Sequence, residues 1–204
     1  MLINGSAINS CAVNGNAAGA RVFSAIANHW VSTRYCCLLT GAENGLATDV
    51  ELPIKSFQTR FTSDYIYLSC VVPGVDRYQD AITERSNGRL KISRIYDYLG
   101  GSSESFLLVD VPFDSMRLDS GGRSGMTATL SGNEYNITVA PQTVELFDPV
   151  YYAATDGALR RYRCRLDPRL RVGDTAVIGD DSLTVGTIIH IVDVKSTLME
   201  IAEV

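Results

Sequence analysis

Histidine is scarce in this sequence of 204 residues, where only His29 and His190 occur. His190 lies inside the apolar run at residues 188–192, and His29 has no nucleophile or second metal ligand near it in the chain. Catalytic zinc needs three protein ligands at a recognisable spacing, and this sequence has no such pattern. We therefore interpret His190 as a satisfied strand residue rather than a catalytic base, and we expect no catalytic metal site.

Long apolar runs and basic leader segments are also missing. No stretch approaches the roughly 20 apolar residues that a membrane-spanning helix needs. The first residues do not combine a basic segment with an apolar run, so we expect neither a membrane association nor a secretory signal. The net charge of -5 and the isoelectric point near 5.0 argue against a dedicated nucleic-acid-binding protein.

Glycine-rich loops that bind phosphate are absent, because the glycines at 100 and 101 precede a strand-like segment rather than a helix. Carboxylates are plentiful, so a hydrolase stays open as a class, with Asp180, Asp181 and His190 as its best candidates. We prefer to interpret Asp180 and Asp181 as a solvated hairpin tip. No motif speaks for catalysis, and we expect no enzyme, no catalytic residue and no cofactor.

The cysteines are odd in number and have no Cys-x-x-Cys spacing. We interpret them as reduced core thiols of a protein made in the cytosol. A metal cluster held by four of them stays open, since distant segments can converge on one site. The five are Cys11, Cys36, Cys37, Cys70 and Cys164.

Most of the remaining sequence predicts β-strands. Hydrophobic residues make up 46% and charged residues 20%, which is typical of a globular protein. Runs of β-branched and aromatic residues end at glycine, proline or Asn-Gly turns, and Pro53 favours an edge position. The predicted strands are residues 30–40, 50–61, 65–72, 89–96, 105–112, 126–131, 159–166, 175–178, 182–186, 188–194 and 198–202.

One helix is predicted over residues 76–86. Asp76 is placed to cap its start, with Gln79 three residues later in the capping-box position. Asn87-Gly88 ends it. Its buried face at helical spacing comprises Tyr78, Ala81, Ile82 and Arg85.

The predicted fold class is mainly β, an α+β protein with one short helix and barrel-like or sandwich-like domains. Residues 20–136 form a β-rich domain with the helix, residues 137–157 a bridging segment, and residues 158–204 a small β-barrel-like domain. Whether the two β regions are separate domains or share one core stays open. Residues 1–19 repeat a short apolar piece followed by Asn-Gly and are either a loose tail or, as we favour, an extended N-terminal arm that becomes ordered on a neighbour.

A row of arginines is the most unusual local feature. Arg161, Arg163 and Arg165 alternate with Tyr162, Cys164 and Leu166, which in a strand places three guanidinium groups on one face. Arg160, Arg169 and Arg171 extend the basic stretch. Aligned like charges repel unless acids lie opposite them. The acids are the chain's own or those of a partner protein, and a nucleic-acid backbone is the least favoured alternative.

Residues 163–175 of the same region resemble a known element. The sequence Asp167-Pro168-Arg169-Leu170-Arg171-Val172-Gly173-Asp174-Thr175 follows a strand and precedes another, as in hub and baseplate proteins at the tail tip of long-tailed bacteriophages. Residues 52–58, residues 67–73 with the helix that follows, and the opening residues 3–9 are also similar to proteins of this kind. The matched motifs are short and structural, and they contain no catalytic residues.

The resemblance implies a virion structural protein, made in the host cytoplasm, that tiles into a symmetric homo-oligomeric ring around the tail channel. Its implied partners are other tail proteins: tail tip, hub, tail tube or distal tail components. Whether the chain is the hub, a neighbouring ring component or an adaptor stays open. The interface candidates are Ile3, Asn4, Gly5, Ile8, Val13, Asn14 and Gly15 in the arm, and Arg161, Arg163, Arg165, Arg169 and Arg171.

A β-barrel module that binds carbohydrate or peptide at a host surface is the alternative. Such a module needs several aromatic side chains exposed together. Tyr96, Tyr98, Tyr151 and Tyr152 are the candidates in this sequence.

Overall fold

The computed structural model of the chain describes residues 30–41, 49–98, 101–120, 125–137, 139–146, 150–156, 159–194 and 196–204. The predicted N-terminal arm, with its interface candidates Ile3, Asn4, Gly5, Ile8, Val13, Asn14 and Gly15, lies outside the described residues. So does His29.

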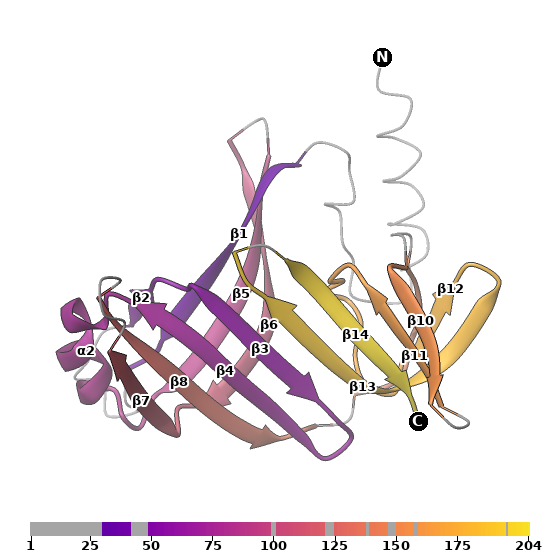
Figure 1. The fold of residues 1–204 in the computed structure, drawn as a ribbon. Coiled ribbons are helices and arrows are strands. Elements are labelled where there is room, and N and C mark those ends of the chain that lie inside the picture. The colour runs from indigo at the N-terminus through magenta and orange to yellow at the C-terminus, as the bar shows by residue number, and fades with distance from the viewer. Residues whose placement is uncertain are drawn as a thin grey trace.

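Two antiparallel sheets make up most of the described chain (Figure 1). The smaller has the order β2 (Val50–Leu52), β1 (Trp30–Leu39), β5 (Arg89–Tyr98), β6 (Ser103–Pro112). The longer runs β10 (Tyr152–Asp156), β11 (Leu159–Cys164), β14 (Thr197–Glu203), β13 (Asp181–Val192), β3 (Ser56–Phe61), β4 (Tyr65–Pro73), β8 (Met126–Tyr135), β7 (Ser115–Ser120). In addition, β12 (Thr175–Ile178) pairs with β13 and, in parallel, with β9 (Thr143–Glu145). The predicted class, mainly β with one short helix, is confirmed.

Strand alternation builds the core between the sheets. On β4, Leu68, Cys70 and Val72 are buried, while the residues between them face outward. On β5, Leu90 and Ile92 occupy the equivalent inner positions. Because side chains alternate along a strand, each sheet presents one apolar face, and the two apolar faces pack against each other.

The long strand β13 joins the two predicted β regions. Its first residues pair with β12, and residues 188–192 pair with β3, placing His190 opposite Thr59. The sequence predicted two strands here, at 182–186 and 188–194. The structure has one strand with an irregularity at Gly186, where a Cβ atom would lie 2.9 Å from the Cα of Val204. Glycine therefore lets the strand continue past the close approach of the C-terminus.

The helix is shorter than predicted. A 3-10 turn, η2 (Val75–Arg77), follows Gly74, whose φ is 60°, and α2 covers only Gln79–Glu84. Asp76 lies inside the 3-10 turn, so the predicted cap is wrong: Tyr78 holds the N-cap position without a side-chain hydrogen bond. The predicted inner face is correct, because Ile82 and Arg85 are buried and Tyr78 and Ala81 half-buried.

Other boundaries also differ from the sequence prediction. Residues 50–61 form two strands, because the chain at 53–55 passes from the small sheet to the long one. The predicted edge position holds only for β2, which ends the small sheet, and is wrong for β3, which lies between β13 and β4 in the long sheet. The strands β7, β9 and β10 were not predicted, and the last two lie within the predicted bridging segment, 137–157.

Candidate functional site

The arginine row lies on β11, between β10 and β14. Arg161 and Arg163 share one strand face, but β11 ends at Cys164, so Arg165 lies beyond the strand. The prediction of three arginines on one strand is therefore wrong by one residue. Arg163 Nη2 lies 2.9 Å from Glu200 Oε2 on β14, and Arg161 is exposed. The chain's own acids thus form ion pairs with part of the arginine row, as Glu200 does with Arg163.

Arg160 faces the opposite side of β11 and is held more tightly. Its Nη2 lies 2.6 Å from Glu203 Oε1, and its Nη1 pairs with Asp181. The Tyr162 hydroxyl also donates to Asp181. Hydrogen bonds from Tyr162 and Arg160 lower the pKa of Asp181, and the bond from Arg160 lowers the pKa of Glu203. Asp181 at the β12–β13 hairpin is thus a structural anchor, which weakens its candidacy as a catalytic acid.

The segment that follows β11 folds around its own charges. Arg169 is buried, and its guanidinium makes a two-point contact with Asp167 (Nε–Oδ1 2.9 Å, Nη2–Oδ2 2.6 Å). It also donates to the main-chain oxygen of Glu145 at 3.1 Å. Arg171 donates from its main-chain nitrogen to Asp174 Oδ2 at 2.7 Å. These contacts give Arg169 and Arg171 a role in shaping the loop. Among the predicted arginines, exposure is greatest at Arg161.

The same segment is fastened to the small sheet. Arg94 on β5 is 3% exposed and donates from Nη1 to the main-chain oxygen of Leu166 at 2.6 Å. Its guanidinium carbon lies 4.8 Å from the centre of the Tyr96 ring, which is also buried. Burial of a charged guanidinium lowers the stability of the fold unless hydrogen bonds and ring contacts compensate for the lost water. The bond to Leu166 and the contact with the Tyr96 ring provide part of that compensation for Arg94. The segment after β11 and the inner face of β5 therefore form one packed joint.

His190 lies in this joint, on the inner face of β13. It is 1% exposed, and its ring centre is 5.3 Å from that of Phe61. Neither ring nitrogen has a hydrogen-bond partner among the described residues, so the predicted satisfied state is not met. Burial, together with the positive charges of Arg171 and Arg94, lowers the pKa of His190 to about 3. His190 is therefore a neutral side chain of the core.

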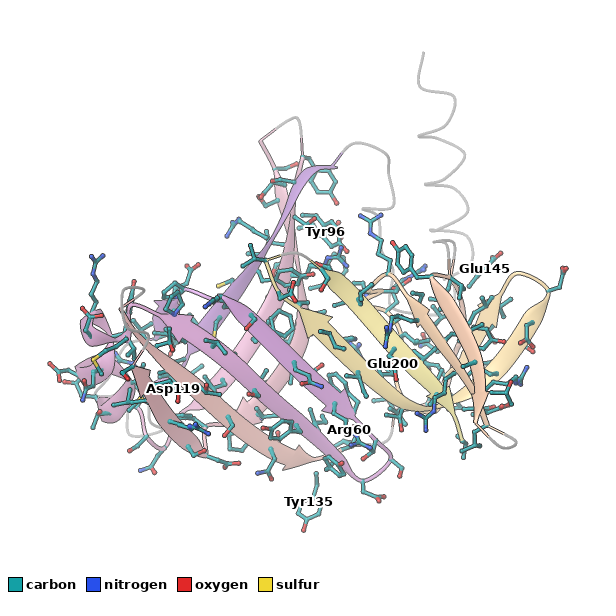
Figure 2. The ribbon with its side chains drawn as sticks, viewed as in Figure 1. Arg60, Tyr96, Asp119, Tyr135, Glu145 and Glu200 are labelled. Atoms are coloured by element: carbon teal, nitrogen blue, oxygen red, sulfur yellow. The ribbon has the colours of Figure 1, made fainter. Side chains whose placement is uncertain are left out.

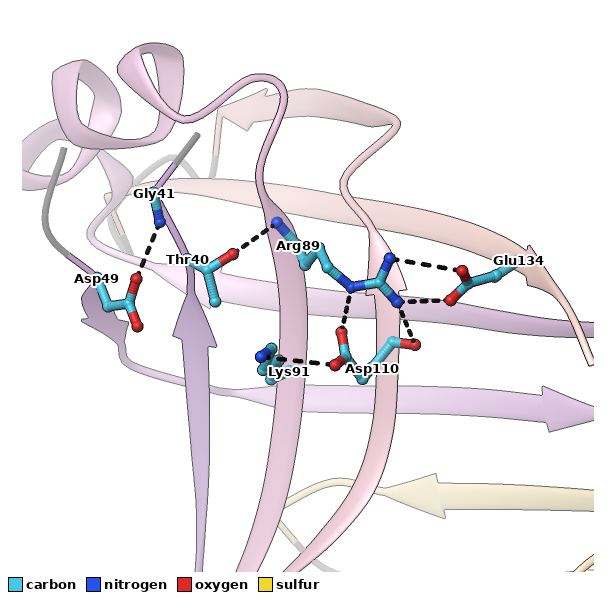
Figure 3. Close-up of polar contacts among 7 residues, drawn as sticks. All are labelled: Thr40, Gly41, Asp49, Arg89, Lys91, Asp110 and Glu134. Atoms are coloured by element: carbon cyan, nitrogen blue, oxygen red, sulfur yellow. Dashed lines mark hydrogen bonds and ion pairs between the residues drawn. The ribbon is translucent and has the colours of Figure 1, made fainter. Parts of the chain in front are cut away.

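A second charged contact closes the other end of the sandwich (Figure 3). Arg89 on β5 donates from Nε to Asp110 Oδ1 of β6 at 2.7 Å and from Nη2 to Glu134 Oε2 of β8 at 2.5 Å. Lys91 also approaches Asp110, at 3.5 Å. Because β8 belongs to the long sheet and β5 and β6 to the small one, Arg89 connects the two sheets.

Three tyrosines gather on the outer face of the long sheet, and sequence analysis missed them. Tyr65 and Tyr135 are paired neighbours on β4 and β8, and Tyr67 follows on the same face of β4. They are 40%, 87% and 40% exposed, and Figure 2 shows Tyr135 projecting away from the sheet. The signal was present, because tyrosines two residues apart in a strand share a face.

The tyrosine group predicted for the binding-module alternative is not assembled as expected. Tyr96 is buried, with its ring against the guanidinium of Arg94. Tyr98 is half-buried, and its hydroxyl donates to Glu104 Oε2 at 2.8 Å. Tyr151 is exposed. The Tyr96 assignment is thus wrong, because β5 turns this residue toward the core, where alternation also places Ile92 and Arg94.

Metal ligands do not gather in the described ranges: no group of three His, Cys, Asp or Glu side chains is placed to hold an ion. No described helix has the length and apolarity needed to cross a membrane. Of the cysteines, Cys37, Cys70 and Cys164 are buried and Cys36 is half-buried, all as free thiols, while Cys11 lies outside the described residues.

Comparison with known proteins finds structures of similar fold but no similar sequence. No protein-family model and no curated protein matches the chain. Among solved structures, the E. coli c3393 protein matches with a TM-score of 0.52 at 6% identity, over 81% of this chain and 75% of that one. That protein is a component of the type VI secretion system and is described as structurally similar to the T4 bacteriophage tail proteins gp27 and gp5. The 43 kDa tail protein of prophage MuSo2 from Shewanella oneidensis matches with a TM-score of 0.45 at 8% identity, over 85% of this chain and 97% of that one. The first match shows a shared fold, and at that level the resemblance stated from the sequence is confirmed.

Proposed function

We propose that this chain is a structural protein of a phage tail tip or baseplate, which assembles with its own copies into a ring or hub around the tail channel and contacts other tail proteins. One observation carries the proposal: the fold is shared with a secretion-system component that is itself described as similar to T4 tail proteins. In this proposal the chain belongs to the virion, is made in the host cytoplasm and acts mechanically rather than as an enzyme.

The edge strands of the two sheets support a role in assembly. Among the described strands, β2 and β6 end the small sheet, and β7 and β10 end the long one. Edge strands carry main-chain donors and acceptors that another strand can pair with. Copies that associate through such edges by a closing rotation form a ring. The predicted arm, residues 1–19, is the segment that we propose adds a strand to a neighbour.

The proposal is tested by the mass of the full-length chain in solution. Light scattering is recorded over a range of concentrations, for the chain alone and with the tail proteins encoded beside it. A closed oligomer or a complex of fixed stoichiometry supports the proposal. A chain that stays monomeric and binds none of those proteins contradicts it.

Removal of residues 1–19 tests the arm separately. The shortened chain is expected to keep its thermal unfolding transition and to be lost from assembled particles. A control chain carries an unrelated tag at the N-terminus in front of the intact arm. Loss of the folded state on truncation, or normal entry into particles without the arm, refutes the proposed arm.

A binding module is the second candidate, and the exposed tyrosines Tyr65, Tyr67 and Tyr135 favour it. Aromatic faces that gather on one surface suit contact with sugars or peptides, and tyrosine is equally enriched at protein interfaces. A glycan array probed with the monomeric chain and with Tyr135→Ala separates these uses. Binding that Tyr135→Ala abolishes supports the module, and absence of any glycan signal supports an interface.

A further inference from the structure

Four side chains between the sheets carry buried polar atoms that have no hydrogen-bond partner among the described residues. These atoms are the hydroxyl oxygens of Tyr35 and Thr59, the Nε of Arg94 and both ring nitrogens of His190. Thr59, Arg94 and His190 are 0%, 3% and 1% exposed. Buried polar groups in folded proteins almost always have a partner, which is a protein group, an ordered water or an ion. The four side chains are therefore candidates for contact with a ligand.

Thr59 and His190 are neighbours on the inner face of the long sheet, as register partners on β3 and β13. On the other side of β13, His190 is paired with Met199 of β14, which is paired in turn with Cys164 at the end of β11 (Figure 1). Residues directly opposite each other in an antiparallel pair have Cβ atoms about 5 Å apart and share a face. The four residues therefore form one row across the sheet, with His190 in its interior.

Tyr35 and Arg94 are register partners on β1 and β5 of the small sheet, and they contact the long sheet on both sides of His190. The Tyr35 ring centre is 5.2 Å from that of Phe57 on the inner face of β3. Arg94 Nη1 donates to the main-chain oxygen of Leu166, two residues beyond the end of β11. The Tyr35–Arg94 pair thus lies across β13 and β14 and faces His190.

The charge at this place is positive. Among the described residues, the contacts of Arg94 are a main-chain oxygen and an aromatic ring, neither of which carries a negative charge. Asp167, the residue after its acceptor, is held by Arg169 at 2.6 Å. The positive charges of Arg171 and Arg94 contribute to the lowered pKa of His190, which agrees with two cations near a neutral ring. A buried positive charge is stabilised by an opposite charge that also accepts hydrogen bonds.

We propose that Tyr35, Thr59, Arg94 and His190 form a binding site for a small inorganic anion, such as chloride, between the two sheets. Each side chain supplies one N–H or O–H donor, and an anion only accepts, so a single ion matches the whole set. The bound ion links the small sheet to the C-terminal strands. Water, which both donates and accepts, is the competing occupant that the test separates. The inference goes beyond the proposed function and does not depend on it.

Thermal unfolding of the full-length chain in chloride tests the site. Sodium gluconate is replaced stepwise by sodium chloride at a constant ionic strength of about 150 mM, which keeps screening fixed. Because a ligand that binds only the folded state raises Tm, we expect a saturating increase of about 3 to 6 °C. Thr59→Val keeps the shape of the side chain, removes its donor and should weaken the apparent affinity for chloride about tenfold. Arg117→Met, at a side chain that is 81% exposed on β7, is the control and should respond like the parent.

Crystals of the unsubstituted chain grown in bromide locate the ion, because bromide scatters anomalously. We expect an anomalous peak within hydrogen-bond distance of Arg94 Nε and a ring nitrogen of His190. The proposal is overturned if chloride leaves the Tm of the parent unchanged, if Thr59→Val responds like the parent, or if the crystals show only water at these atoms. The two measurements on the parent chain decide the question even where a variant does not fold.

Discussion

Arg94 and Leu166 are joined by a 2.6 Å hydrogen bond from the guanidinium Nη1 to the main-chain oxygen. The two residues lie 72 positions apart in the chain, one on the small sheet and one after β11. The motif that resembles tail-tip proteins at 163–175 is thus bound to the domain that precedes it. This contact links the segment after β11 to the small sheet, and the pairing of β13 with β3 links the C-terminal strands to the rest of the long sheet.

Replacement of Arg94 is expected to loosen the joint. Arg94→Ala removes a buried side chain and leaves the Leu166 oxygen without its donor, and we expect unfolding free energy to fall by about 2 to 4 kcal/mol. Urea unfolding measures the change. Lys91→Ala on the same strand, which removes a half-exposed side chain, is the control and should cost under about 1 kcal/mol. Equal losses in the two variants contradict a special role for Arg94.

Arg89 is expected to contribute less, because its side chain is 38% exposed and solvent screens its ion pairs. Arg89→Met should lower the free energy of unfolding by about 1 kcal/mol. The matched control is Arg117→Met, whose partner Asp119 lies on its own strand and whose side chain is 81% exposed. Chemical denaturation should show no measurable loss for that control. A larger loss at Arg117 than at Arg89 disagrees with the cross-sheet contact in Figure 3.

Because His190 is buried without a hydrogen-bond partner among the described residues, we expect the protein to lose stability in mild acid. The pKa of His190 is lowered to about 3 in the fold from a usual 6.5, so the unfolded chain binds the proton more readily between these values. Stability is therefore unaffected well above pH 6.5 and decreases as pH falls below it, by about 2 kcal/mol at pH 5.

His190→Phe tests this pH dependence. The difference in unfolding free energy between the variant and the parent chain is measured from pH 8 to pH 5, which removes contributions that both proteins share, such as those of Asp181 and Glu203. The variant should gain about 2 kcal/mol relative to the parent over this range. A constant difference means that His190 is not buried in its neutral form.

Arg161 and Arg163 are expected to respond differently to charge reversal. Arg161→Glu changes an exposed side chain and should weaken association with an acidic tail partner about tenfold, with little change in Tm. Arg163→Glu places like charges at the Glu200 pair and should lower Tm. Binding is measured at two salt concentrations, since an electrostatic contact weakens with salt. Unchanged binding by Arg161→Glu removes the arginine row from the interface.

Sequence analysis predicted the strands whose patterns repeat most regularly. Residues 175–178 and 65–72 follow from apolar and β-branched alternation ended by glycine or proline, and the structure has strands there. The strand at 115–120 was missed, because its residues are largely exposed and carry no buried run. Local pattern does not determine which edge such a strand adds to.

The site was harder to predict than the fold. Alternation correctly placed Arg161 and Arg163 on one face, but nothing local predicts that Glu200 lies opposite, since that depends on the register of β14. The acceptor of the buried Arg94 lies in a loop 72 residues away in the chain. Charged and aromatic residues in a strand are equally suited to solvent or to the core until the facing layer is known.

The protein composition of purified tail particles tests the proposed function most directly. Particles from the genome that encodes this chain are isolated with and without its reading frame and analysed by mass spectrometry and electron microscopy. The account predicts that the chain is present in a fixed copy number, and that without it tails lack their tip or do not form. Complete tails that contain none of this chain, in either preparation, contradict it.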